Sequence, residues 1–325
     1  MLRAMAVMGI HEERCCLSAG NSLRAHGALL AVAFIWGASF PLVKSALNDA
    51  SPLLFLALRF LLATLLALPL FPALRGRWVQ GELAGGMALG VLLGVGFTLQ
   101  TLGLVQTTPS RSAFLTSLYV VFVPVLSLPV TGHRPRAASW CGAVLALGGL
   151  ALMTRDGALF RWQPGDLLTL GCALAFALHI LGVGLLTARY DCRRLFVIQI
   201  ATAAVLLAVA TPLEAVRWQP GSRLAGAVFL TGGLATTLAF YVQNKVQSRT
   251  SSSRTAIIFA MEPVFAALVV ALLAGGRWDL PLAQSLGAAL IVAALLVAAL
   301  GARLSGPQAP PGPGAGPRRR TASSP

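Results

Sequence analysis

Long stretches without a charged residue are the feature that most restricts what this chain of 325 residues can fold into. Eight such stretches are apolar and long enough to cross a hydrocarbon layer about 30 Å thick as a helix. They cover residues 25–43, 83–110, 112–133, 137–154, 167–188, 195–213, 224–244 and 280–302. Two more, 50–74 and 255–276, each carry a single charge, Arg59 and Glu262. The sequence therefore predicts an all-α, polytopic membrane protein of ten transmembrane helices.

Composition supports the membrane class. Hydrophobic residues make up 57% of the chain, charged residues only 11%, and the mean hydropathy is +0.78, all outside the range of soluble domains. The two charged stretches are still predicted to insert, because each apolar neighbour favours insertion by about 0.3–0.6 kcal/mol against about 3 kcal/mol for one central acid.

The net charge of +15 follows from the loops. Of the 25 lysines and arginines, 17 fall on the side of the two termini and six on the other side. Basic loops stay in the cytoplasm, so both termini are predicted to be cytoplasmic, and the charge needs no nucleic-acid partner to explain it. Residues 1–26 are predicted to be an N-terminal tail, and whether they belong to the functional protein stays open. Residues 303–325, rich in Pro and Gly, are predicted to be a disordered basic tail.

The two halves of the chain resemble each other. At a shift of 143 residues, "PSRSAF" aligns with "SSRTAI", and the identical or matched pairs include Gln100 with Gln243, Thr107 with Thr250, Arg111 with Arg254, and Phe122 with Phe265. At a shift of 138, "GALL" from Gly27 aligns with "GDLL" from Gly165. We therefore predict two five-helix repeats, 27–154 and 165–302. Since five is odd, the second repeat must enter the bilayer in the opposite orientation, an arrangement typical of alternating-access transporters.

Four stretches resemble the EamA family of the drug/metabolite transporter superfamily. They are "WGASFPLVKSAL" (36–47), "LRFLLA" (58–63), "TTPSRSAFLTSLYVVFVPVLS" (107–127) and "RTAIIFAMEPVFAALVVALL" (254–273). The resemblance covers residues 27–302. It implies a multi-pass carrier of small metabolites in the cell inner membrane, often an exporter, with both termini cytoplasmic. It implies no particular substrate.

Glu262 and Arg59 are the candidate charged residues of a site. Pro263 cannot donate a backbone hydrogen bond, so carbonyl groups one turn earlier are freed beside the Glu262 carboxylate. Together they could bind a cationic group, a proton or a hydroxyl; the alternative is that Glu262 only ties two helices together. Arg59 lies about 10 Å into its predicted span, at 1.5 Å per residue. It is predicted to be a gate or structural charge, with direct solute contact as the alternative.

Neutral polar residues complete the candidate binding site. Gln100 and Gln243 occupy equivalent positions in the two repeats, and Tyr119 is equivalent to Glu262. Amides in apolar helices need partners, which can be a solute, each other or a neighbouring helix. The predicted substrate-binding residues are Trp36, Gln100, Tyr119, Gln243, Asn244 and Glu262. His179, deep in its stretch, could relay protons or simply pack.

The sequence contains no HExxH, GxSxG or P-loop motif and no clustered metal ligands, so no enzymatic activity, cofactor or metal is predicted. We expect a secondary transporter that exports small polar or amphipathic metabolites such as amino acids. The sequence does not decide whether transport is coupled to protons. A proton-coupled importer of a sugar or vitamin precursor is the alternative of the same architecture. A membrane scaffold or integral-membrane enzyme is the alternative of another class. A homodimer is compatible with the sequence.

Overall fold

The computed structural model describes residues 19–132, 134–153, 163–273 and 282–304. Within these ranges the regular elements are helices. Two of the connecting segments are paired by an isolated antiparallel β-bridge between Ala50 and Trp218. The helices of the first half are α2 (Ala19–Ala46), α3 (Pro52–Leu66), η1 (Leu68–Arg75), α4 (Glu82–Val105), α5 (Pro109–Ser117), α6 (Tyr119–Thr131) and α7 (Ala137–Met153). Those of the second half are α8 (Pro164–Leu186), α9 (Cys192–Ala210), η2 (Thr211–Leu213), α10 (Ser222–Leu230), the π-helix η3 (Thr231–Leu238), α11 (Ala239–Gln247), α12 (Ser252–Phe259), α13 (Glu262–Leu273) and α14 (Leu282–Leu304).

The described residues of each of the ten predicted stretches fall mainly on one of these helices or on successive ones. In the described part of the chain, seven helical segments are long and apolar enough to cross a membrane. The pair α3 and η1, bent by 63°, makes an eighth if it is one span, and α7 and α14 contain shorter apolar helices. The protein is therefore an all-helical, multi-pass membrane protein, and ten spans stay a prediction. Helix α2 begins at Ala19, inside the predicted tail 1–26; residues 1–18 and 305–325 of the predicted tails lie outside the described residues.

The fourth and ninth predicted spans begin and break in the same way. The Thr108 hydroxyl caps α5 by accepting a hydrogen bond from the backbone N–H of Arg111, and the Ser251 hydroxyl caps α12 by accepting one from Arg254. Each span is then interrupted, at Leu118 between α5 and α6 and at 260–261 between α12 and α13. These features lie 143 residues apart, so the matching sequences fold into matching local structures.

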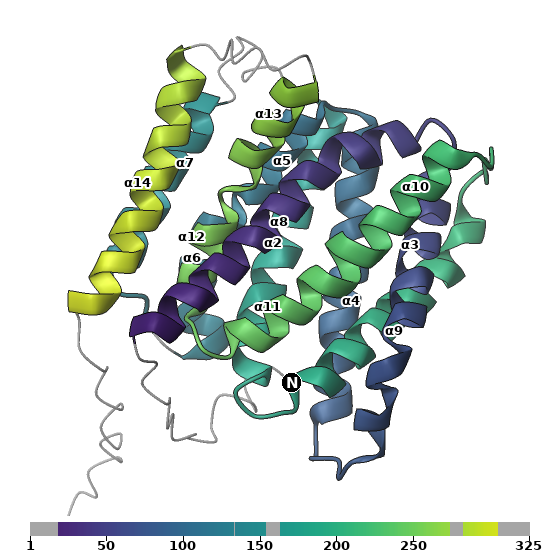
Figure 1. The fold of residues 1–325 in the computed structure, drawn as a ribbon, viewed down its shortest axis with the longest axis horizontal. Coiled ribbons are helices and arrows are strands. Elements are labelled where there is room, and N and C mark those ends of the chain that lie inside the picture. Colours follow the sequence, from purple (N-terminus) through teal and green to yellow (C-terminus); the bar gives the residue numbers. More distant parts are fainter. Residues whose placement is uncertain (1–18, 133, 154–162, 274–281, 305–325) are drawn as a thin grey trace, which may run out of the picture.

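Contacts between the two halves come in matched pairs (Figure 1). Helix α2 packs against α13, and its counterpart α8 packs against α5 and α6. Likewise α4 packs against α9, while the segment η3 packs against α3. Two further contacts join counterparts directly, α3 with α9 and α7 with α14. This arrangement is compatible with two repeats related by a two-fold axis, as the sequence predicts.

Glycines allow the closest of these contacts. A Cβ atom on Gly90 of α4 would lie 2.6 Å from the carbonyl oxygen of Gln199, and a Cβ atom on Gly232 of η3 would lie 3.0 Å from that of Arg59. Along α4, a Cβ atom on each of Gly86, Gly90 and Gly94 would meet side chains of α9 at 2.8 Å or less. The spacing of four residues therefore forms a helix-packing surface, as the sequence indicates.

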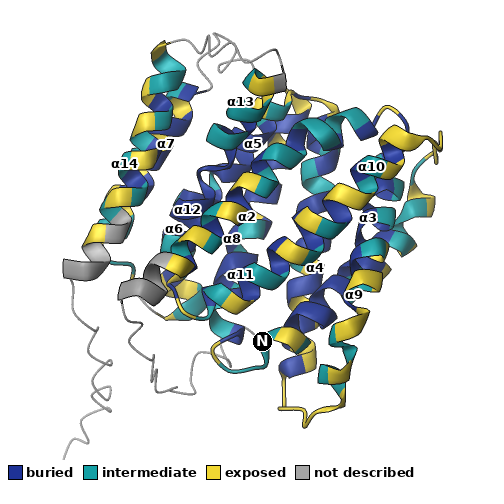
Figure 2. Cartoon of the chain, in the orientation of Figure 1, coloured by how far each residue is buried: buried dark blue, intermediate teal, exposed yellow. Residues whose placement is uncertain are grey.

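Large apolar side chains cover the outside of the bundle. Val144, Leu167 and Val209 are between 65% and 72% exposed. Figure 2 shows exposed positions along outer helices such as α14 and α10, and buried positions in the middle of the bundle, as on α12. An apolar surface of this extent is unfavourable in water and favourable in a lipid bilayer.

Candidate functional site

A cavity lies in the middle of the bundle, between the two halves. It is lined by Trp36, Ser39, Phe40, Arg59, Phe97, Gln100, Tyr119, Phe176, His179, Ile180, Phe240, Gln243, Phe259 and Glu262. The centres of water-sized molecules can occupy ≈ 40 Å³ of it. Because the centre of one water molecule needs about 10–15 Å³, the cavity has room for a few waters or for part of a small solute. The cavity in this conformation is therefore narrow, and a larger metabolite requires its walls to move.

Aromatic rings form much of the wall. The Trp36 ring lies 4.8 Å from that of Phe259 and 5.1 Å from that of Phe240, measured between centroids. The Phe97 ring contacts those of Phe176 and Phe240 at 5.2 and 5.9 Å. Edge-to-face and tilted pairs of this kind contribute about 0.5–1.5 kcal/mol each beyond burial. The wall therefore consists largely of aromatic side chains, which the sequence analysis did not predict apart from Trp36 and Tyr119, and polar side chains occupy fewer places in it.

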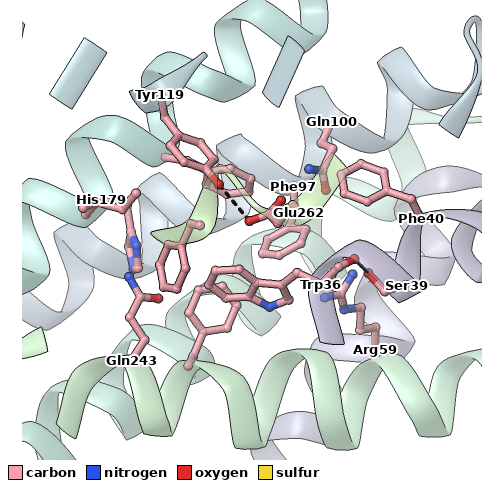
Figure 3. A pocket seen from close by; sticks show the side chains of 14 residues that line it. Trp36, Ser39, Phe40, Arg59, Phe97, Gln100, Tyr119, His179, Gln243 and Glu262 are labelled. Carbon is pink, nitrogen blue, oxygen red and sulfur yellow. Dashed lines mark hydrogen bonds between the residues drawn. The ribbon is translucent and has the colours of Figure 1, made fainter. Parts of the chain in front are cut away.

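Glu262 enters the cavity from the first turn of α13, directly after the break in the ninth predicted span. Its side chain is buried, and its Oε1 accepts a hydrogen bond of 2.9 Å from the hydroxyl of Tyr119 (Figure 3). Tyr119 begins α6, so the two residues occupy equivalent positions after equivalent breaks. Helix α2 approaches this turn closely, because Gly37 has no Cβ atom to meet the Glu262 carbonyl oxygen, which would be only 2.5 Å away.

Arg59 enters the cavity from α3 and is 2% exposed. Its Nε donates a hydrogen bond of 2.7 Å to the hydroxyl of Thr236, and its guanidinium lies over the Phe97 ring, 4.5 Å from the centroid. Thr236 belongs to the π-helix η3, a wide turn of a kind frequent at functional sites. The structure therefore places Arg59 on the cavity wall.

Arg59 and Glu262, the two acidic or basic side chains that the sequence places in the site, do not form an ion pair with each other. Among the described residues, the ion pairs are those of Arg111 with Asp166, Arg194 with Glu82, and Arg223 with Asp49. Neither Arg59 nor Glu262 takes part in them. In the view of Figure 3 the guanidinium and the carboxylate lie apart, with the Trp36 side chain between them. A guanidinium and a carboxyl group thus face one cavity from different walls, and both are buried where an unpaired charge is unfavourable.

The other predicted site residues are positioned as follows. Trp36 lines the cavity and its Nε1 donates to the carbonyl oxygen of Ala235 at 2.8 Å. Gln100 and Gln243 both line it, and each donates to a neighbour in its own half, at 3.2 and 3.0 Å. In the buried Gln243 amide the oxygen has no partner in the described structure. The twin amides therefore keep hydrogen-bonding capacity toward the cavity.

Asn244 is the predicted site residue that does not line the cavity. Adjacent residues of a helix point about 100° apart, so when Gln243 faces the cavity Asn244 faces the surrounding helices. Its side chain is fully buried, and neither amide atom has a hydrogen-bond partner among the described residues. The cavity lining therefore includes five of the six predicted substrate-binding residues and does not include Asn244.

Several lining residues were missed by the sequence reasoning, mainly phenylalanines. Phenylalanine in an apolar helix looks the same whether it faces lipid, core or cavity. The repeat did contain a usable signal, since Phe97 and Phe240 are equivalent at the same shift of 143 residues as the two glutamines. His179 also lines the cavity, held by a hydrogen bond of 2.9 Å between its Nε2 and Oε1 of the buried Gln199 on α9.

Comparison with known proteins agrees with this architecture. The model of the EamA-like transporter family matches residues 23–155 and again residues 163–300. The chain belongs to the EamA-like transporter family. Proteins similar to it include an uncharacterized transporter of Archaeoglobus fulgidus, 33% identical over 273 residues, with 84% of each chain covered. The uncharacterized inner membrane transporter YedA of Escherichia coli K12 is 29% identical over 157 residues, which cover 46% of this chain and 50% of YedA.

A solved crystal structure shares the fold. Its TM-score is 0.70 at 22% sequence identity, over 86% of this chain and 98% of the other. Family membership and the apolar membrane-spanning helices identify an EamA-type transporter. No group of three or more His, Cys, Asp or Glu side chains that could hold a metal occurs in the described part of the chain.

Proposed function

We propose that this EamA-family protein is a secondary transporter of the cell inner membrane that exports small polar or amphipathic metabolites, amino acids or related compounds, by alternating access. The observation that carries the proposal is the cavity in which Arg59 and Glu262 stand unpaired with each other. The proposed architecture is ten transmembrane helices in two inverted repeats, 27–154 and 165–302, with both termini in the cytoplasm.

The separated charges favour a solute that is itself a zwitterion. A buried guanidinium is a strong partner for a carboxylate, which it can bind through two parallel hydrogen bonds. The Glu262 carboxylate is the matching acceptor for an ammonium group, and the aromatic wall can hold an apolar or cationic portion of the solute. An amino acid presents both charges close together. Gln100 and Gln243 then supply neutral donors and acceptors around it.

Alternating access is supported by the matched contacts between the halves. If α2 packs on α13 as α8 packs on α5 and α6, exchange of the two halves gives a second conformation of similar energy that opens to the opposite side. A solute shifts the two populations only through contacts that differ between them. The cavity then has one gate toward each side of the membrane. The equivalent helix breaks at Leu118 and at 260–261 can rearrange, so that one gate is open while the other is closed.

Thermal unfolding of the purified protein tests the solute class, since a ligand of the folded state must raise the melting temperature. The panel contains amino acids, the amines and carboxylic acids that each lack one of the two charges, and sugars. We expect stabilisation by some amino acids and weaker or no stabilisation by their single-charge analogues. Stabilisation by sugars alone would contradict the proposal. It would favour the alternative function, a proton-coupled importer of a sugar.

Direction and coupling need reconstituted vesicles. Efflux and uptake of the stabilising amino acid are measured with and without a pH gradient, in wild-type protein and in Lys245→Gln, which changes an exposed residue of α11 away from the cavity. A rate that follows the pH gradient indicates proton coupling, and a rate that follows only the solute gradient excludes it. Unchanged solute distribution under all gradients would sink the transport proposal and favour a scaffold.

A further inference from the structure

The guanidinium of Arg59 is planar and carries N–H donors on Nε and on both Nη atoms. The Nε–H group donates a hydrogen bond of 2.7 Å to the hydroxyl of Thr236, and both residues are buried. In the part of the chain that the structure describes, this is the hydrogen bond that the Arg59 side chain makes. Because Arg59 lines the cavity, the N–H groups of its two Nη atoms are available to a solute (Figure 3).

Aromatic rings restrict the same guanidinium from another direction. Its Cζ atom lies 4.5 Å from the centroid of the Phe97 ring and 5.9 Å from that of Phe60. With the Nε edge bonded and a face covered by Phe97, the edge formed by the two Nη atoms is the part that can bind a further group. A carboxylate fits this edge, because it is planar and its two oxygens accept two parallel hydrogen bonds.

Thr236 reaches Arg59 from the π-helix η3, whose wide turn is stabilised by one of its own side chains. The hydroxyl of Thr237 donates to the carbonyl oxygen of Gly232, five residues earlier, at 2.8 Å. Gly232 also lets α3 approach η3 closely, since a Cβ atom there would lie 3.0 Å from the carbonyl oxygen of Arg59. At the shift of 143 residues Thr236 is equivalent to Leu93, which has no hydroxyl. The fold of a repeat therefore does not require a hydroxyl at this position.

From these contacts we propose that Thr236 is a positioning residue, which holds the Arg59 guanidinium so that its two Nη atoms bind the carboxylate of the solute. The inference rests on the proposed function and narrows its solute class, because this edge selects a carboxylate over a tetrahedral anion. A sulfonate or phosphonate has a third oxygen outside the plane of the guanidinium, where Arg59 has no donor and where the Phe97 ring covers one side. Without the Thr236 hydroxyl the guanidinium is free to turn and to offer its Nε edge, so the selection becomes weaker.

Thermal unfolding of the purified protein with pairs of matched probes tests this role, since a ligand of the folded state raises the melting temperature. The members of each pair differ in the anionic group: acetate and methanesulfonate, β-alanine and taurine, leucine and its phosphonate analogue. We expect at least one carboxylate to stabilise the wild type, at about tenfold lower concentration than its partner. In Thr236→Val, which keeps the shape of the side chain, this ratio should fall to about twofold or less, because carboxylate binding weakens about tenfold.

Two further variants separate positioning from folding. Thr236→Ser restores the hydroxyl and should restore the ratio, which a role in packing alone would not explain. Thr237→Val is the matched control, because the Thr237 hydroxyl bonds to the carbonyl oxygens of Gly232 and Ala63 rather than to Arg59. It should lower the melting temperature without solute and leave the ratio unchanged. If Thr236→Val does not fold, Thr236→Ala replaces it with the same expected ratio.

The outcomes distinguish this inference from the proposed function. An unchanged ratio in Thr236→Val, or an equal fall of the ratio in Thr237→Val, would overturn the positioning role and leave the proposed function intact. Stabilisation by acetate but by neither amino acid would support the Arg59 site and contradict the amino-acid proposal. Absence of stabilisation by every carboxylate would refute both.

Discussion

The hydroxyl of Tyr119 donates a hydrogen bond of 2.9 Å to Oε1 of Glu262, and the two residues are 143 residues apart. This separation is the shift at which the two halves of the sequence align. The bond therefore joins two equivalent positions, each directly after a break in its span, across the interface between the halves. One position carries an acid and the other a phenol, so the site is less symmetric than the fold around it.

Glu262→Gln keeps the size of the side chain and removes its charge. We expect the fold to be retained, because Tyr119 can donate to the amide oxygen, and transport to be abolished or altered. Tyr119→Phe removes only the donor and should weaken transport less, with a loss on the order of the 1–3 kcal/mol that it costs to leave a buried hydrogen-bonding group without its partner. Vesicle transport of the stabilising amino acid measures both. Full activity of Glu262→Gln at every pH would count against a role in binding.

Arg59→Gln and Arg59→Lys separate geometry from charge at the opposite wall. Lysine keeps the charge but cannot form the two parallel hydrogen bonds of a guanidinium with a carboxylate. We expect both variants to lose stabilisation by carboxylate-bearing ligands, Gln more than Lys, with about tenfold or more weaker binding for Gln. The amine that lacks the carboxyl group should bind the wild type and Arg59→Gln alike. Equal losses for amine and amino acid would show that Arg59 only supports the fold.

The sequence predicted the helical class, the apolar stretches and several polar residues of the cavity wall, because each of these can be recognised from a pattern in the sequence alone. A segment that crosses the hydrocarbon layer must be largely free of charge, which makes the spans recognisable in the sequence. The alignment of the repeats makes Gln100 equivalent to Gln243 and Tyr119 equivalent to Glu262. Orientation of individual side chains was harder. Asn244 and Gln243 are neighbours in an apolar helix whose residues are polar on more than one face, so the pattern could not show which of them faces the cavity.

The aromatic wall escaped prediction for a related reason. In a membrane protein both the lipid-facing surface and the interior are apolar, so Phe97 and Phe240 do not differ in type from residues that face lipid. The π-helix η3 between α10 and α11 was also not predicted, since the glycines and threonines of its segment "TGGLATTL" are compatible with an ordinary membrane-spanning helix. Its carbonyl at Ala235 and hydroxyl at Thr236 receive the donors of Trp36 and Arg59, which shows that backbone irregularity helps to position the site.

Gly90→Ala tests the close contact of α4 with α9. A Cβ atom at Gly90 would lie 2.5 Å from the Cβ of Thr202 and 2.6 Å from the carbonyl oxygen of Gln199, so the helices must separate. We expect destabilisation of about 1–3 kcal/mol, read as a lower melting temperature. Gly226→Ala in α10 is the control, because its Cβ would meet no atom within 4 Å. That change should be neutral or stabilising by about 0.5–1 kcal/mol. Similar effects at both positions would contradict the packing argument.

The dependence of stability on acidic pH tests the Asp49–Arg223 ion pair. Asp49 lies between α2 and α3, outside the membrane-spanning segments. The hydrogen bond from Arg223 is the main reason that the pKa of Asp49 is lowered in the folded protein. Protonation is therefore less favourable in the folded than in the unfolded state. The pair's contribution to stability is present above the ordinary aspartate pKa of about 3.9 and is lost as the pH falls through the lower folded value.

Arg223→Gln removes this dependence. We expect the variant to melt below the wild type at neutral pH and the difference between them to shrink as the pH is lowered toward 3, because the protonated Asp49 no longer gains from the arginine. Other carboxyl groups titrate in both proteins and cancel in the difference. The exposed Arg75 of η1 provides the control, and Arg75→Gln should follow the wild type at every pH. A difference that stays constant or grows on acidification would show that Arg223 stabilises the protein by packing rather than through the Asp49 carboxylate.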